Sequence, residues 1–122
     1  MEYVPPTFEP PHRVLLFAAA AREWYRAPDE AARRRMLERM RRFFEGWEAG
    51  GARLLASFDD DYFAFGQPSS LDYSIYVLYE VDSLDLVVER IQSAREEIDG
   101  LRLDSCFRVE CRVGRPLFLL DR

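Results

Sequence analysis

Lysine is missing from this chain, in which all 17 basic residues are arginine. Without lysine, the chain cannot form a Schiff base through a side-chain amine, and it lacks the lysine of a phosphate-binding P-loop. We interpret the all-arginine composition as codon or proteome bias rather than as selection for guanidinium chemistry. The sequence also contains no nucleophile elbow, glycine-rich nucleotide loop or histidine-based triad, which argues against hydrolases and nucleotide-dependent enzymes.

Cysteine and histidine are scarce, since the sequence holds two cysteines and one histidine. Cys106 and Cys111 stand five apart in one predicted strand and should face opposite sides of it, which argues against an internal disulfide. His12 adjoins a proline-rich segment, so we expect a structural role for it rather than haem ligation or base catalysis. Because the chain has no cluster of cysteine and histidine, we predict no zinc site. We also expect no other metal and no cofactor.

The chain also lacks a long apolar run and an excess of positive charge. No run approaches the roughly 20 apolar residues of a membrane span, and the net charge is −5. An acidic chain argues against binding to nucleic acid or to a membrane surface, because both need a basic face. The first residues are acidic and proline-rich with no apolar signal core, so we expect a cytoplasmic protein.

The length of 122 residues suits one domain with a single core. Residues 1–12 should form an extended proline-rich arm, and residues 13–122 the domain. Apolar and polar spacing predicts the order strand, helix, strand, strand, helix, strand. The strands are expected at 13–20, at 53–59 with a continuation at 62–65, at 72–81 and at 105–114, and the helices from Pro28 to Gly50 and from Ser83 to Gly100. This is the ferredoxin-like βαββαβ pattern of the α+β class, a four-stranded antiparallel sheet with both helices on one face.

The last predicted strand carries a row of three charges on one side, Arg108, Glu110 and Arg112, opposite an apolar side. Two helices cannot cover both faces of the sheet, and Tyr76 and Leu78 add bulk to the uncovered face. An apolar face of this size is typical of an association surface. We therefore predict a homodimer packed sheet against sheet, a dimeric α+β barrel. The charge row would then form interface ion pairs, with Glu80 or with the partner strand, or else line a ligand site.

Three other groups of side chains are candidates for chemistry. The run Asp59–Asp61 offers carboxylates for a divalent metal or a base, but we interpret it as a polar bulge or turn, because consecutive strand residues diverge and no second acidic cluster completes a coordination shell. Trp24 and Tyr25 either cover the mouth of a pocket or anchor a helix. Tyr73 and Tyr79 should point toward the helices, where they bound a cavity for a planar aromatic ligand or fill the core.

Three segments, at 58–69, 74–82 and 108–115, resemble the IacB-like proteins of bacterial indole-3-acetate catabolism. Residues 22–30 and the first half of the chain are more loosely similar to the darcynin family. The resemblance implies a dimeric α+β barrel and a place in aromatic or indolic metabolism. The matched residues that become candidates through it are Asp59, Asp60, Asp61, Glu110, Arg112 and Arg115.

Two hypotheses of different class follow. In the first, the protein is a cofactor-independent isomerase, cyclase or monooxygenase-type enzyme that acts on a planar aromatic acid, with Asp61 or Glu110 moving a proton. The aromatic ring of the bound acid would be held by Trp24, Tyr25, Tyr73 and Tyr79. The carboxylate or enolate of the acid would be bound by Arg108 or Arg112. In the second, the protein is a non-catalytic dimer that binds a metabolite or a pathway enzyme.

Overall fold

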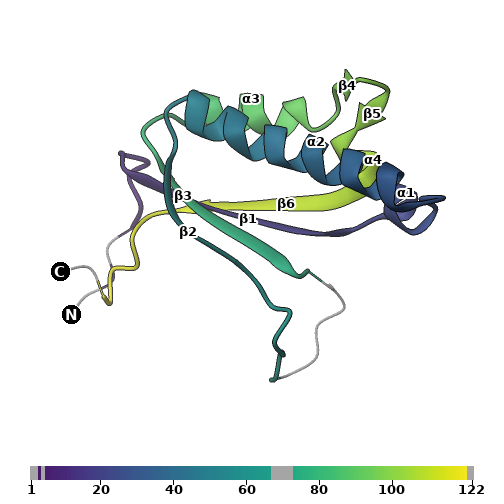
Figure 1. Ribbon diagram of the computed structural model, residues 1–122. Coiled ribbons are helices and arrows are strands. Elements are labelled where there is room, and N and C mark those ends of the chain that lie inside the picture. Colours follow the sequence, from purple (N-terminus) through teal and green to yellow (C-terminus); the bar gives the residue numbers. More distant parts are fainter. Residues whose placement is uncertain (1–2, 4, 67–72, 121–122) are drawn as a thin grey trace.

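A four-stranded antiparallel sheet and two long helices form the fold in the computed structural model, which describes residue 3 and the ranges 5–66 and 73–120 (Figure 1). The strands follow one another across the sheet in the order β2, β3, β1, β6. Their bounds are β1 (His12–Ala20), β2 (Arg53–Asp59), β3 (Ile75–Val81) and β6 (Phe107–Gly114). The predicted α+β class and four-stranded antiparallel sheet are confirmed.

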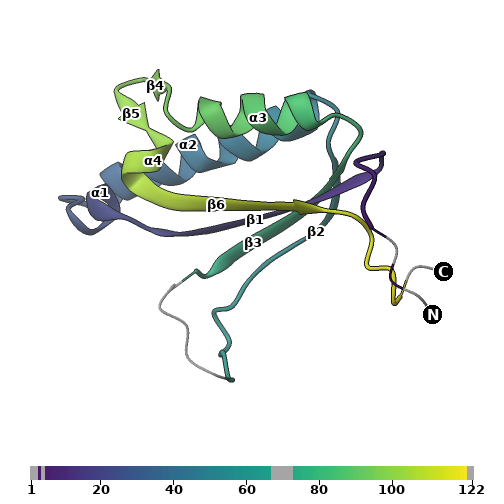
Figure 2. The same ribbon diagram turned by 180° about the vertical axis from the view of Figure 1, so that it is seen from behind.

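The two long helices, α2 (Glu30–Ala49) and α3 (Leu84–Ser93), lie on the same face of the sheet (Figures 1 and 2). Two single-turn helices, α1 (Arg22–Tyr25) and α4 (Leu103–Cys106), adjoin one end of the sheet. We call the opposite face of the sheet the outer face. No helix in the described part of the chain covers it (Figure 2).

Helix α2 begins two residues after its predicted start at Pro28 and ends one residue before its predicted end at Gly50. Asp29 caps its first turn, because the Asp29 Oδ1 atom accepts a hydrogen bond from the Ala32 backbone N–H at 2.9 Å. Gly51 ends it in a left-handed conformation with φ +107°, which favours glycine. The apolar stripe that packs on the sheet consists of Met36, Met40, Phe43 and Trp47. Their spacing of three and four residues is what buries one side of the helix.

The core lies between these helices and the sheet. Val14, Leu16 and Ala18 of β1 are at most 1% exposed and point toward the helices. In the sheet register they stand opposite alternate residues of the neighbouring strands, Ile75, Val77 and Tyr79 of β3 and Val109, Cys111 and Val113 of β6. Alternation along the strands therefore leaves the intervening side chains on the outer face.

The second long helix ends seven residues before the predicted end at Gly100. Buried Arg39 of α2 donates hydrogen bonds to the Ser93 and Glu96 carbonyls, at 3.1 and 3.2 Å. These bonds supply donors to carbonyl groups at and just beyond the C-terminal end of α3, which have no partner within the helix. A small hairpin follows, formed by β4 (Glu97–Ile98) and β5 (Leu101–Arg102). Its turn is Asp99 and Gly100, both with positive φ, and an Asp-Gly pair of this kind favours a hairpin over a helix.

The last strand begins at Phe107 rather than at 105, because the preceding residues form α4. Cys106 belongs to this helical turn, where its Sγ atom donates a hydrogen bond to the Arg102 carbonyl at 3.4 Å. The prediction that Cys106 and Cys111 share one strand is therefore wrong. Both cysteines are nevertheless free thiols.

The predicted continuation of the second strand at 62–65 is also wrong. The backbone N–H of Asp61 bonds to the Asp59 Oδ1 atom at 3.2 Å, and this local turn ends β2. Tyr62, Phe63 and Phe65 beyond it are 98%, 75% and 92% exposed. Strand β3 begins at 75 rather than at 72, and residue 72 lies outside the described ranges. The sequence also predicts a turn at Gly-Gln-Pro-Ser-Ser (66–70), of which the structure describes Gly66 alone.

Candidate functional site

The predicted site residues do not form one constellation. Tyr73 and the charge row lie on the outer face, whereas Tyr79 lies on the helix side of the sheet. Trp24, Tyr25 and Asp61 lie outside both groups. The structure therefore contains two candidate sites, one on each face.

The first candidate site, on the outer face, is an aromatic and charged cluster. The Phe17 and Tyr73 rings meet edge to face, with centroids 4.6 Å apart. The Arg108 guanidinium lies 5.7 Å from the Tyr73 ring centroid, and that of Arg112 lies 5.7 Å from the Phe17 centroid. Glu110 stands directly opposite Phe17 in the pairing of β1 with β6. We call these five residues the Phe17 cluster.

The orientation predicted for Tyr73 is wrong, because its ring packs on Phe17 of the outer face and not toward the helices. The regular strand β3 begins only at Ile75, so the alternation that places Tyr79 on the helix side does not extend to Tyr73. Phe17 was not predicted as a site residue. It sits in an apolar run, which gave no signal of a polar neighbourhood.

Glu110 has one carboxylate oxygen in an unusual position. Its Oε2 atom is buried and has no hydrogen-bond partner within the described ranges, although the side chain as a whole is 39% exposed. The nearest cation is the Arg112 Nη2 atom at 3.8 Å, beyond hydrogen-bond distance. A buried acceptor without a donor is costly, so a hydrogen-bond donor from a ligand would stabilise this oxygen.

The predicted pairing of the charge row with Glu80 is wrong. Glu80 is bound instead by Arg13 at 3.2 Å and by Arg53 at 3.0 Å, on the neighbouring strands. Arg53 also pairs with Asp82 at 3.0 Å, and this hydrogen bond lowers the pKa of Asp82. In the described part of the chain, Glu110 and Arg112 therefore form the single ion pair within the row.

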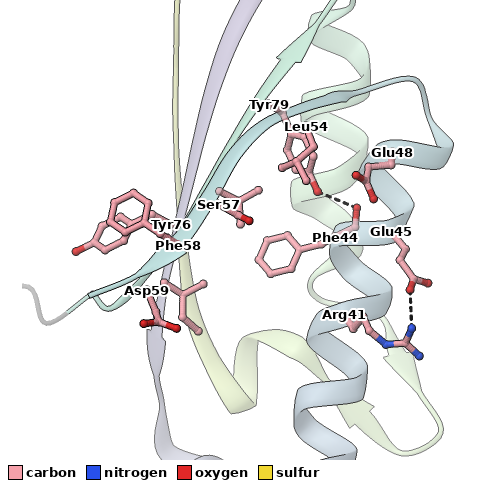
Figure 3. Close-up of a pocket in the computed structure, with 12 residues that line it drawn as sticks. Arg41, Phe44, Glu45, Glu48, Leu54, Ser57, Phe58, Asp59, Tyr76 and Tyr79 are labelled. Carbon is pink, nitrogen blue, oxygen red and sulfur yellow. Dashed lines mark hydrogen bonds and ion pairs between the residues drawn. The ribbon is translucent and has the colours of Figure 1, made fainter. Parts of the chain in front are cut away.

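The second candidate site is a cleft of about 540 Å³ between α2 and the edge strand β2 (Figure 3). It exists because neither long helix covers β2, whose seven residues are all exposed. Its lining comes from α2 and from the strands β2 and β3. The lining residues are Arg41, Phe44, Glu45, Glu48, Leu54, Ser57, Phe58, Asp59, Ile75, Tyr76, Val77 and Tyr79. We call it the α2–β2 cleft.

Tyr79 forms a fixed wall of this cleft. Its ring stacks on Trp47, with centroids 5.6 Å apart and the planes 11° from parallel. Its hydroxyl donates a hydrogen bond to the Phe44 carbonyl at 3.1 Å. Burial, and secondarily the Glu48 carboxylate, raises the pKa of Tyr79 above its ordinary value.

The charges around the α2–β2 cleft are mainly negative. Arg41 is engaged on both sides, since its guanidinium donates to Glu38 and, at 2.9 Å, to Glu45. Glu48 and Asp59 have no ion-pair partner among the residues that the structure describes. The cleft therefore disfavours an anionic ligand, a property that no sequence pattern indicated.

High pH is expected to destabilise the fold through Tyr79. Because burial raises the pKa of Tyr79, the unfolded chain loses this proton at a lower pH than the folded chain does. The contribution of the protonated Tyr79 side chain to stability is therefore complete below the pKa of the unfolded chain, about 10. This contribution is lost as the pH rises through the pKa of the folded chain. Urea denaturation at about pH 9 and about pH 11 measures the loss, which should be smaller in Tyr79→Phe. Equal losses in the two proteins would contradict the expectation.

The remaining predicted residues have other surroundings. Trp24 packs on Phe107, with ring centroids 5.5 Å apart, and therefore anchors α1 against the end of the sheet. Tyr25 is 73% exposed. Arg115 lies over the rings of Tyr3 and Phe118, at 5.5 and 5.7 Å, outside both candidate sites.

The three consecutive aspartates diverge. Asp59 lines the α2–β2 cleft, the Asp60 Oδ2 atom accepts a hydrogen bond from the Tyr76 hydroxyl at 3.0 Å, and Asp61 is exposed. Within the described ranges, no three His, Cys, Asp or Glu side chains are grouped to hold a metal ion. His12 is 6% exposed at the start of β1.

No protein-family model matches this chain, and no curated protein or solved structure matches it. The resemblance to the IacB-like and darcynin families therefore stays a prediction. None of the helices in the described ranges has the length and apolar character needed to span a membrane.

Proposed function

We propose that this chain is a homodimeric protein of aromatic or indolic metabolism that binds a planar aromatic acid at the Phe17 cluster. The observation that carries the proposal is the buried Glu110 Oε2 atom, which lacks a hydrogen-bond donor in the described part of the chain and lies among two aromatic rings and two guanidinium groups. Aromatic rings can hold the ligand ring, and guanidinium groups can bind its carboxylate. Both requirements meet on one sheet face.

The strand order β2, β3, β1, β6, with α2 and α3 on one face, supports a ferredoxin-like fold. The outer face supports dimerisation because it carries adjacent apolar side chains. Leu15 pairs with Leu78 in the sheet register, and Phe58 stacks on Tyr76 with centroids 4.8 Å apart. A second copy packed on this face would remove these side chains from water. It would also cover the Phe17 cluster and shield that cluster from solvent.

The chemistry that suits the Phe17 cluster is proton transfer without a cofactor. Glu110 would take a proton from a carbon next to a carbonyl group, and the electron pair of the broken C–H bond would move onto the carbonyl oxygen. Arg108 or Arg112 would stabilise the enolate oxygen, and Glu110 would return the proton at a second position. The step is an isomerisation, so electrons balance without an oxidant or reductant.

A specific observation favours the alternative of a non-catalytic binding or partner module. The Arg108 and Arg112 guanidinium groups already lie over the Tyr73 and Phe17 rings. The cluster is therefore partly filled by its own side chains, and a ligand would have to displace them. A dimer whose interface is made of these stacked pairs needs no substrate.

Two probes separate these hypotheses. Indole-3-acetate measures binding, and the keto–enol conversion of indole-3-pyruvate measures proton transfer. Glu110→Gln should slow the conversion by about 10²- to 10⁴-fold while indole-3-acetate still binds, because the amide keeps the shape of the carboxylate. Arg112→Gln should weaken the binding of indole-3-acetate.

The dimer itself is the control. Glu110→Ala should leave the dimer intact, as measured by analytical ultracentrifugation, if the cluster is a ligand site. If Glu110→Ala weakens dimerisation instead, the charge row is structural and the proposal of a site fails. If the unmodified protein binds indole-3-acetate but does not accelerate the keto–enol conversion of indole-3-pyruvate, the result would support the non-catalytic module.

A further inference from the structure

We propose that the α2–β2 cleft is a separate binding site for a small molecule that combines an aromatic ring with a protonated amine. Its volume of about 540 Å³ lies within the range of roughly 300–1,000 Å³ that small-molecule sites occupy. The cleft lies on the helix side of the sheet, so it does not depend on the function proposed for the Phe17 cluster. Two lining residues, Phe58 and Tyr76, also lie on the outer face, and a second copy packed there would leave the other lining residues open.

The walls of the cleft suit a flat ring. Phe44 from α2 faces Leu54 and Ser57 of β2 across the cleft, as Figure 3 shows. Tyr79 forms the wall at one end, and its stacking on Trp47 together with its hydrogen bond to the Phe44 carbonyl fixes its ring in place. Leu54 is 48% exposed, which leaves apolar area for a ligand to cover. Fixed walls reduce the ordering cost of binding.

The charges select a cation. Glu48 lies at the end of the cleft next to Leu54, and Asp59 lies at the opposite end (Figure 3). Neither carboxylate has an ion-pair partner in the described part of the chain, whereas the one lining arginine, Arg41, is held by two carboxylates. An ammonium group can therefore pair with Glu48 or Asp59, but a carboxylate would be repelled.

The two faces of the sheet thus select ligands of opposite charge. The Phe17 cluster presents two guanidinium groups and one carboxylate, whereas the α2–β2 cleft presents three carboxylates and one guanidinium. Both offer aromatic contact. A pair of ligands with the same ring and opposite charge can therefore distinguish the sites.

Tryptamine and indole-3-acetate are such a pair, and two-dimensional NMR of the full chain can locate each. We expect tryptamine to shift backbone signals of β2 and of the C-terminal half of α2. Ser57→Trp should abolish this binding by filling the cleft, and circular dichroism checks that the variant folds. One of the two variants Glu48→Gln and Asp59→Asn should weaken binding by about two- to fivefold, as for an exposed ion pair, and thereby identify the carboxylate that pairs with the ammonium group. Glu89→Gln, on α3 and outside the cleft, removes the same charge and should have no effect.

Two results would overturn the proposal. One is tryptamine binding that Ser57→Trp leaves unchanged, and the other is indole-3-acetate binding in the cleft as tightly as tryptamine. Arg112→Gln keeps this test apart from the function proposed above, because it should weaken indole-3-acetate binding and leave tryptamine binding unchanged. Failure of one ligand at its site therefore does not count against the other.

Discussion

Trp47→Ala is expected to destabilise the protein by about 3–5 kcal/mol, the usual cost of removing a large aromatic side chain from a core. Trp47 is fully buried between α2 and the sheet. It stacks on Tyr79 and meets Phe43 edge to face, with centroids 6.2 Å apart. Since domains of this size are stable by only about 5–15 kcal/mol, the loss is a large fraction of the whole. Urea denaturation followed by circular dichroism measures it.

The control for this prediction is Trp47→Phe. The Trp47 Nε1 atom is buried and has no hydrogen-bond partner in the described part of the chain, so replacement by phenylalanine breaks no hydrogen bond. The ring that supports Tyr79 is kept, although it is smaller. Trp47→Phe should therefore cost clearly less than Trp47→Ala. If the two variants were equally unstable, the stack on Tyr79 would not be the source of the stabilisation.

The same substitution links the core to the α2–β2 cleft. Without Trp47, the Tyr79 ring loses the surface that holds it as a wall of the cleft. At a temperature where Trp47→Ala is still folded, tryptamine should bind more weakly to it than to Trp47→Phe. The packing of Trp47 in the core thus determines the shape of the α2–β2 cleft.

The sequence predicts those elements in which one strong pattern acts alone. Strand β1 is a continuous apolar run, and the stripe from Met36 to Trp47 repeats at helical spacing, so both were placed within two residues. The α2 boundaries also carry local signals, an aspartate cap and a glycine end. Helix propensity, apolar spacing and end signals all favour the same structure there, and the tertiary contacts agree with it.

The region between α3 and β6 could not be predicted in the same way, because local and long-range effects compete there. The apolar spacing up to Ile98 favours a longer helix, yet Arg39 of α2, more than 50 residues away, bonds to the carbonyls that end α3. The Asp99-Gly100 turn then forms a hairpin. A contact of that kind is visible only once the chain is folded.

The candidate sites were predicted only in part, for a geometric reason. The charge row of β6 follows from strict alternation, whereas Tyr73 precedes the regular strand and turns to the outer face. The α2–β2 cleft depends on which strand lies at the sheet edge and on how far α2 covers it. Alternation places a side chain on a face, but it does not place a helix over a strand.

Leu78→Arg is expected to convert the proposed dimer into a monomer. Leu78 lies in the middle of the outer face, opposite Leu15 in the β1–β3 register. In a monomer the new guanidinium reaches water, so folding should be little affected. In a symmetric dimer each copy brings one such guanidinium into the interface, and burying unpaired charge there costs about 3 kcal/mol or more. The dimer dissociation constant should therefore rise by about 100-fold or more.

Sedimentation equilibrium over a range of concentrations measures this change, and Val88→Arg is the matched control. Val88 lies on α3, on the other side of the sheet, and is 57% exposed, so an arginine there should leave the dimer intact. If Leu78→Arg and Val88→Arg associate equally well, the outer face is not the interface, and the Phe17 cluster is not closed by a second copy. If Leu78→Arg is monomeric and folded but still binds indole-3-acetate fully, one chain suffices for the site, and the dimer serves stability rather than binding.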